Sequence, residues 1–173
     1  ASALAQNMIG MTSTSAAIAV SILALFNTAG RIVAGYISDK IGRINTLSMA
    51  FIISIVGLFC LAISSQGDIV KFYIGISIVG VCFGAFMGVF PGFTVDQFGA
   101  KNNSVNYGIM FIGFAFAGYI GPTVMKNVYA SYGDYKRAFI IGIVMALVGL
   151  GLTFVYRFVN NKDLVKKELK KIS

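Results

Sequence analysis

Five long apolar stretches, separated by short polar connections, make up most of the chain. They run over residues 13–37, 47–64, 69–95, 105–128 and 138–158. Because a helix needs roughly 20 mainly apolar residues to cross a bilayer, this pattern predicts five transmembrane helices. Residues 1–11 are interpreted as the last turns of a sixth helix that has lost its beginning. The sequence therefore predicts an all-α membrane protein.

The connections between the stretches are short enough to make neighbouring helices run antiparallel. They read "SDKIGRIN", "SSQGD", "DQFGAKNNS" and "SYGDYKR". The alternating course places nine Lys and Arg residues on one side of the membrane and four on the other. Since basic residues gather on the cytoplasmic side, we expect the first connection and the C-terminus in the cytoplasm.

Composition agrees with a membrane protein. The chain is 57% hydrophobic and 12% charged, whereas soluble domains are about 45–50% apolar and about 25% charged. The net charge of +8 is concentrated at segment ends and in the tail, as topology signals are. We therefore expect the lipid bilayer as a partner, and no nucleic acid.

Glycine recurs at every fourth position in the third stretch, at Gly80, Gly84, Gly88 and Gly92. This spacing places the four residues on one face of a helix. A face without side chains lets the backbone of a neighbouring helix approach closely. The stripe therefore predicts a tight helix–helix contact.

Arg31 lies within the first apolar stretch, where a charge is costly. An arginine at the centre of a membrane helix costs about 2.5–3.5 kcal/mol on insertion scales and by default indicates a functional site. Its helical face is small and polar: Ser21, Ala24, Asn27, Thr28, Arg31, Gly35 and Ser38. We interpret this face as the wall of an aqueous cavity where Arg31 binds an anion and Asn27 adds a neutral donor. Snorkelling of Arg31 toward the interface is the structural alternative.

Other kinds of chemistry have few candidate residues. The acidic residues lie in connections, at helix ends or in the tail, and histidine is absent, so no proton carrier inside the membrane is encoded here. Cys60 and Cys82 lie in apolar stretches and are interpreted as small buried hydrophobes. Without a nucleophile–base pair, a metal-ligand cluster or a phosphate loop, we expect neither an enzyme nor a bound metal or cofactor.

The segment "GYISDKIGR" resembles the cytoplasmic signature G-x-x-x-D-[RK]-x-G-[RK] of the major facilitator superfamily. The matching residues are Gly35, Asp39, Lys40, Gly42 and Arg43. The resemblance implies close helix packing at the glycine and a gating cluster of charges, with Asp96 placed across the same membrane face. It implies half of a major facilitator fold, with residues 1–173 forming helices seven (truncated) to twelve and a basic cytoplasmic tail at about 159–173. The N-terminal half of the same transporter is then the expected partner.

Further segments are similar to the oxalate/formate antiporter and monocarboxylate transporter branch of that family. They are the "NTAGR" approach to the signature, "DQFG" at 96–99 and "NYG" at 106–108. By this likeness, Arg31 matches an arginine implicated in carboxylate binding. Oxalate transporters carry a lysine about two turns after "NYG", where this chain has Gly113 and Phe114. The single remaining charge favours a monoanion.

The resemblance implies a secondary active transporter that moves a small monocarboxylate, such as lactate, pyruvate or formate, by alternating access. The expected substrate-binding residues are Arg31, Asn27, Tyr107 and Phe114. An oxalate/formate-type antiporter, a drug exporter and a non-transporting receptor of the same fold are the alternatives. The expected location is the plasma (inner) membrane.

Overall fold

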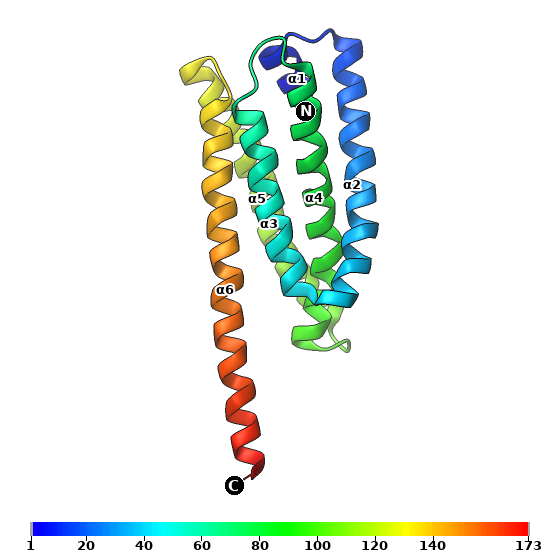
Figure 1. Cartoon of the computed structure of the whole chain (residues 1–173), viewed down its shortest axis with the longest axis vertical. Helices are drawn as coiled ribbons and strands as arrows, with labels where there is room; N and C mark the ends of the chain where they lie inside the picture. The colour runs from blue at the N-terminus through cyan, green and yellow to red at the C-terminus, as the bar shows by residue number, and fades with distance from the viewer. Residues whose placement is uncertain (1, 173) are drawn as a thin grey trace.

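The computed structural model describes residues 2–172, with the side chains of residues 2–160, as a bundle of helices running up and down (Figure 1). The described residues form six helices: α1 (Ser2–Ile9), α2 (Ser13–Ile41), α3 (Arg43–Ala62), α4 (Ile69–Phe98), α5 (Asn103–Tyr132) and α6 (Lys136–Ile172). Five of them, α2 to α6, are long and apolar enough to span a membrane. The predicted all-α fold with five spans is confirmed, and a short helix, α1, precedes them.

The polar connection after α2 is shorter than expected. "SDKIGRIN" is not a loop, because α2 continues to Ile41 and α3 starts at Arg43, so Gly42 alone joins them. Gly42 has φ 89°, in the left-handed region that glycine adopts without the strain of a side chain. Its N–H donates to the Ser38 carbonyl at 3.0 Å and closes the last turn of α2. Asp39 and Arg43 therefore both lie on helices, one on each side of a sharp reversal.

The glycine stripe of α4 forms the contact with α2. A methyl group at Gly80 would lie 3.0 Å from the Leu23 carbonyl oxygen, and one at Gly88 would lie 2.7 Å from that of Arg31. At Gly84, between them, a methyl group would overlap the Asn27 carbonyl. The predicted close approach of a neighbouring backbone is confirmed, and the backbone belongs to the helix that carries Arg31.

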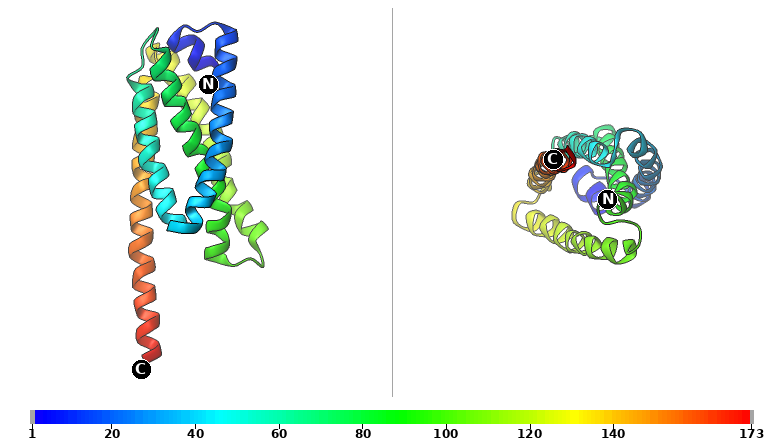
Figure 2. Two further views of the ribbon diagram at one scale, coloured as in Figure 1. Left: turned by 45° about the vertical axis from the view of Figure 1, so that its right-hand side comes forward. Right: turned by 90° about the horizontal axis from the view of Figure 1, so that it is seen from below.

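The α3 helix packs against α4 on one side and α6 on the other, whereas α5 lies apart along one edge of the bundle (Figure 2). No residue of α5 is buried. An apolar cavity of about 650 Å³ separates residues 113–125 of α5 from α3, α4 and α6. Leu4 of α1 lines this cavity, so α1 reaches into the space between α5 and the other helices.

Asp68, in the turn before α4, has a shifted pKa. The hydrogen bond from the Lys71 ammonium to Asp68, 2.9 Å long, holds the pKa of this carboxyl below its usual value. The Ser65 backbone N–H donates to the same carboxylate and lowers the pKa further. Asp68 is therefore ionised at neutral pH and stabilises the α3–α4 turn.

Candidate functional site

Arg31 lies in the middle of α2 with an exposed side chain. Its Nε donates to Oδ1 of Asn27, one turn earlier, at 3.2 Å. The ion pairs among the described residues involve Arg43 and Lys71, and none involves Arg31. The guanidinium therefore has one neutral partner and an uncompensated positive charge.

The surface of α2 divides into three strips. Gly30, Ala34 and Ser38 belong to the buried strip that packs on α4. Ser21, Thr28 and Arg31 follow the adjoining strip and are exposed. The third strip is apolar and also exposed, and it contains Leu25, Ile32, Val33 and Tyr36. The structure thus separates the predicted polar face from the apolar face, except that Ser38 turns into the packing contact.

The backbone around Arg31 is fixed by α4. The nearest neighbours of Gly84 include the Asn27 carbonyl and the Arg31 nitrogen, and those of Gly88 include the Arg31 carbonyl. Because these contacts are backbone to backbone, the stripe holds α2 and α4 close together at the level of Arg31. The glycine stripe therefore fixes the height at which the guanidinium leaves α2.

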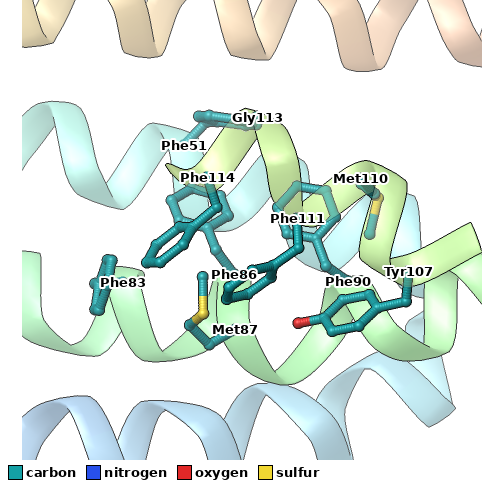
Figure 3. Close-up of a pocket in the computed structure, with 10 residues that line it drawn as sticks. All are labelled: Phe51, Phe83, Phe86, Met87, Phe90, Tyr107, Met110, Phe111, Gly113 and Phe114. Carbon is teal, nitrogen blue, oxygen red and sulfur yellow. The ribbon is translucent and has the colours of Figure 1, made fainter. Parts of the chain in front are cut away.

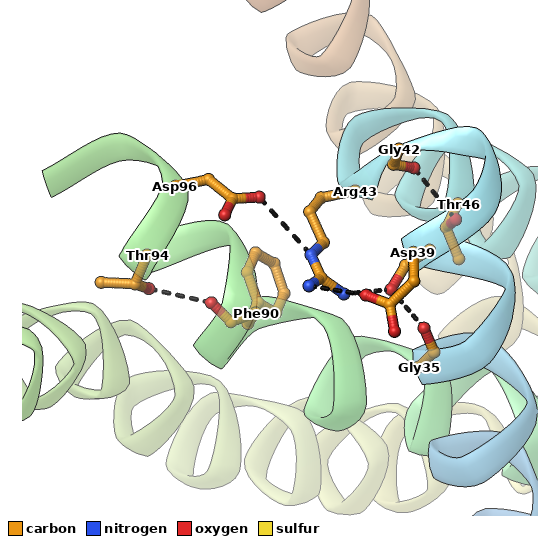
Figure 4. A network of polar contacts seen from close by, with 9 residues as sticks. Gly35, Asp39, Gly42, Arg43, Thr46, Phe90, Thr94 and Asp96 are labelled. Carbon is orange, nitrogen blue, oxygen red and sulfur yellow. Dashed lines mark hydrogen bonds and ion pairs between the residues drawn. The ribbon is translucent and has the colours of Figure 1, made fainter. Parts of the chain in front are cut away.

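A second cluster joins three helices at the end of α2 (Figure 4). Arg43 Nη2 lies 2.8 Å from Asp39 Oδ1, and Arg43 Nε lies 3.5 Å from Asp96 Oδ2 on α4. Arg43 Nη1 also donates to the buried Ser38 hydroxyl. Gly92, the last member of the stripe, leaves room for this guanidinium, since a methyl group there would lie 2.8 Å from Arg43 Cζ. We call Asp39, Arg43 and Asp96 the clasp.

Two residues of the signature stand outside the clasp. The Lys40 ammonium lies 4.4 Å from the centre of the Tyr36 ring and forms no ion pair within the described part of the chain. A methyl group at Gly35 would meet no atom of the described residues within 4 Å, so the close packing expected there is not present. The Gly35 carbonyl instead accepts the Ser38 hydroxyl at 2.7 Å.

Tyr107 and Phe114 belong to a separate aromatic cluster. They line an apolar cavity of about 380 Å³ between α5, α4 and α3 (Figure 3). Phe111 connects them, with ring centres 5.6 Å from Tyr107 and 4.8 Å from Phe114, and Phe114 also contacts Phe83. Within the described residues, no hydrogen bond joins this cluster to Asn27 or Arg31. The four expected substrate-binding residues therefore form two groups.

Phe83 and Phe111, which also line this cavity and contact Phe114, were not among the residues expected from the sequence. Both belong to apolar helices in which aromatic residues are frequent, so nothing in their local pattern distinguished them. The spacing of Tyr107, Phe111 and Phe114 on one helical face was the available signal.

Comparison with known proteins identifies the family of the chain. A family model described as Major Facilitator Superfamily matches residues 1–171. The chain belongs to the major facilitator superfamily. No solved structure matches it.

Several curated proteins of this superfamily are similar in sequence. The "Uncharacterized MFS-type transporter YhjX" of Escherichia coli is 36% identical over 64% of the chain and 27% of its own length. The "Oxalate:formate antiporter" of Oxalobacter formigenes is 32% identical over 85% of the chain and 35% of its own length. The "Probable nitrate transporter NarT" of Staphylococcus haemolyticus is 29% identical over 95% of the chain and 40% of its own length. The chain thus spans well under half the length of these relatives.

Proposed function

We propose that this major facilitator chain is part of a secondary active transporter for a small organic monoanion, most simply a monocarboxylate such as formate, lactate or pyruvate. The observation that carries the proposal is the exposed guanidinium of Arg31, which has no carboxylate partner among the described residues. An unpaired charge in a transmembrane helix is stable only where water or a ligand reaches it. An anionic substrate supplies that partner.

The hydrogen bond with Asn27 defines how the anion approaches. Because Nε of Arg31 is engaged by Asn27, the two terminal nitrogens remain for the ligand, and their spacing suits the two oxygens of a carboxylate. The Asn27 amide nitrogen remains available as a further donor. Tyr107 and Phe114 would contact the apolar part of the substrate when the helices move during transport.

The charge of the substrate is inferred from α5. Gly113 and Phe114 occupy the stretch where a second cation would favour a dianion. Two similar proteins have names that specify oxalate with formate, and nitrate. Formate and nitrate are both small planar monoanions. Nitrate is therefore the second candidate, favoured by a similarity that covers 95% of the chain.

Counterflow in vesicles containing the full-length protein tests the proposal. We expect labelled formate, lactate or pyruvate to exchange rapidly, whereas oxalate exchanges poorly because Arg31 is a single cation. Labelled nitrate serves as the second arm. Binding of a monoanion without exchange would indicate a receptor, and exchange of apolar or cationic compounds alone would indicate a drug carrier.

The remaining features of the proposal follow from alternating access. The transport route would lie between this bundle and the N-terminal half of the transporter, where substrate sites of such folds are found. The distribution of Lys and Arg supports a cytoplasmic C-terminus, and we infer the plasma (inner) membrane as the location. Gly42 would support the reversal between α2 and α3, and the clasp would stabilise one of the two access states.

Replacing Asp39 by asparagine should shift the balance between these states while anion binding persists. The change removes the 2.8 Å ion pair with Arg43, and Asp39 is far enough along α2 to leave Arg31 in place. The measurement is cysteine labelling from each membrane face, in which accessibility should change severalfold. Lys40→Gln is the matched control, since Lys40 stands outside the clasp. Equal accessibility in the Asp39→Asn variant and the unsubstituted protein would contradict the gating role.

A further inference from the structure

A second arginine lies between α3 and α6, near the end of the last apolar span. Arg157 Nη2 donates to the Ser48 hydroxyl at 3.2 Å, and Ser48 Oγ lies 2.9 Å from Thr153 Oγ1. Both hydroxyl residues are buried. The contact between α3 and α6 therefore contains a polar cluster within otherwise apolar surfaces.

The charge of this cluster is not compensated within the described residues. The ion pairs among the described residues of the whole bundle involve Arg43 and Lys71, and none involves Arg157. A guanidinium carries five N–H donors. Arg157 Nε is buried and has no acceptor in the described part of the chain, and burying a charged group without partners is costly. An anion at the accessible part of this guanidinium would supply the missing countercharge.

The Arg157 side chain is half-buried and lies at the margin of the contact between α3 and α6. Tyr156, the preceding residue, contacts Phe93 of α4, with ring centres 5.4 Å apart. Successive residues of a helix point about 100° apart, so Arg157 leaves α6 on a different flank. Its Cζ lies 5.7 Å from the exposed ring of Phe154. The half-buried Arg157 side chain therefore lies beside an exposed apolar ring at the surface of α6.

We propose that Arg157, held in place by Ser48, binds the phosphate group of an anionic phospholipid at the margin of the contact between α3 and α6. The arginine fork matches phosphate oxygens, and basic pockets between transmembrane helices are known sites for anionic headgroups. Arg157 lies at the end of the last apolar stretch, residues 138–158, just before the polar sequence that begins at Asn160, which suits the depth of a headgroup. Five lysines follow in the sequence, at 162, 166, 167, 170 and 171, and add attraction for an anionic surface.

This site is separate from the proposed transport site. Arg31 belongs to α2, and within the described residues α2 and α6 do not pack against each other. The lipid proposal therefore does not depend on which anion is transported, or on whether the protein transports at all. Its test measures lipid binding directly.

The first experiment uses the unsubstituted full-length protein. Phenylglyoxal modifies accessible arginines, and peptide mass spectrometry compares Arg157 with Arg137, which lies at the start of the same helix and contacts Tyr132. Adding phosphatidylglycerol to phosphatidylcholine vesicles should slow modification of Arg157 severalfold more than modification of Arg137, because only Arg157 would hold a headgroup phosphate. Equal slowing at both arginines would overturn the proposal. Protection by inorganic phosphate in pure phosphatidylcholine would also overturn it, because the site would then take free phosphate.

The second experiment compares two variants by native mass spectrometry. Arg157→Gln should lose one bound phosphatidylglycerol, whereas Arg137→Gln, which removes the same charge at the opposite end of α6, should retain it. Retention of the lipid by Arg157→Gln with unchanged affinity would overturn the proposal. If Arg157→Gln does not fold, the protection experiment decides the question on the unsubstituted protein.

Discussion

Replacing Arg31 by glutamine is expected to lower the transport of a carboxylate at least about 30-fold in the full-length protein. Glutamine keeps a polar side chain at the position but removes the charge and the paired terminal donors. Losing one partner of a desolvated, hydrogen-bonded charge pair costs about 2–5 kcal/mol, and about 1.4 kcal/mol corresponds to a factor of ten. The measurement is the initial rate of uptake of the labelled carboxylate at a concentration below saturation.

Two further substitutions separate the effect of the positive charge at position 31 from the effect of the paired guanidinium donors. Arg31→Lys keeps the charge but has no planar fork, and its ammonium cannot reproduce both the Asn27 hydrogen bond and paired donation to the ligand. We expect intermediate activity for this variant. Lys126→Gln removes an equal charge from α5, near the predicted outer surface, and should leave transport nearly unchanged. Transport by Arg31→Gln at the rate of the unsubstituted protein would show that the arginine is only structural, as in the drug-carrier alternative.

The main features of the fold were predictable because each depends on local pattern. Apolar length predicts spans, and the four-residue spacing of the α4 glycines predicts a packing face. The C-terminal end of α2 was not predictable in this way. Asp39 and Lys40 are polar, so hydropathy places them in a loop, whereas the backbone hydrogen bond from Gly42 to Ser38 keeps them helical. Hydropathy reports the environment of a residue, not the hydrogen bonding of its backbone.

The candidate site was predictable only in part, for a related reason. Asn27 and Arg31 are one turn apart, so their contact follows from helical geometry alone. The separation of Tyr107 from Arg31 depends on how α5 lies relative to α2, which no local spacing specifies. The contact between Ser48 and Arg157, 109 positions apart, likewise depends on the packing of two distant helices. Lys40 was placed in the gating cluster by the signature, but its side chain turns toward Tyr36, one turn earlier.

Replacing Gly84 by alanine is expected to destabilise the protein and to lower transport, although the added group is a single methyl. The methyl would overlap the Asn27 carbonyl and lie 3.0 Å from the Arg31 nitrogen. Both are backbone atoms of α2, so the collision cannot be relieved by turning a side chain. Overpacking of this kind costs about 1–3 kcal/mol, and the better helix propensity of alanine offsets at most about 1 kcal/mol. Thermal unfolding and carboxylate uptake measure the two effects.

Gly151→Ala provides the matched control, because it makes the same substitution inside a helix without the collision. Gly151 is exposed on α6, and a methyl group there would meet no atom of the described residues within 4 Å. Helix propensity alone should then leave the protein unchanged or more stable by up to about 1 kcal/mol. The two variants therefore have opposite expected signs. If Gly84→Ala were as stable as Gly151→Ala, the close contact between α2 and α4 would not be what fixes the position of Arg31.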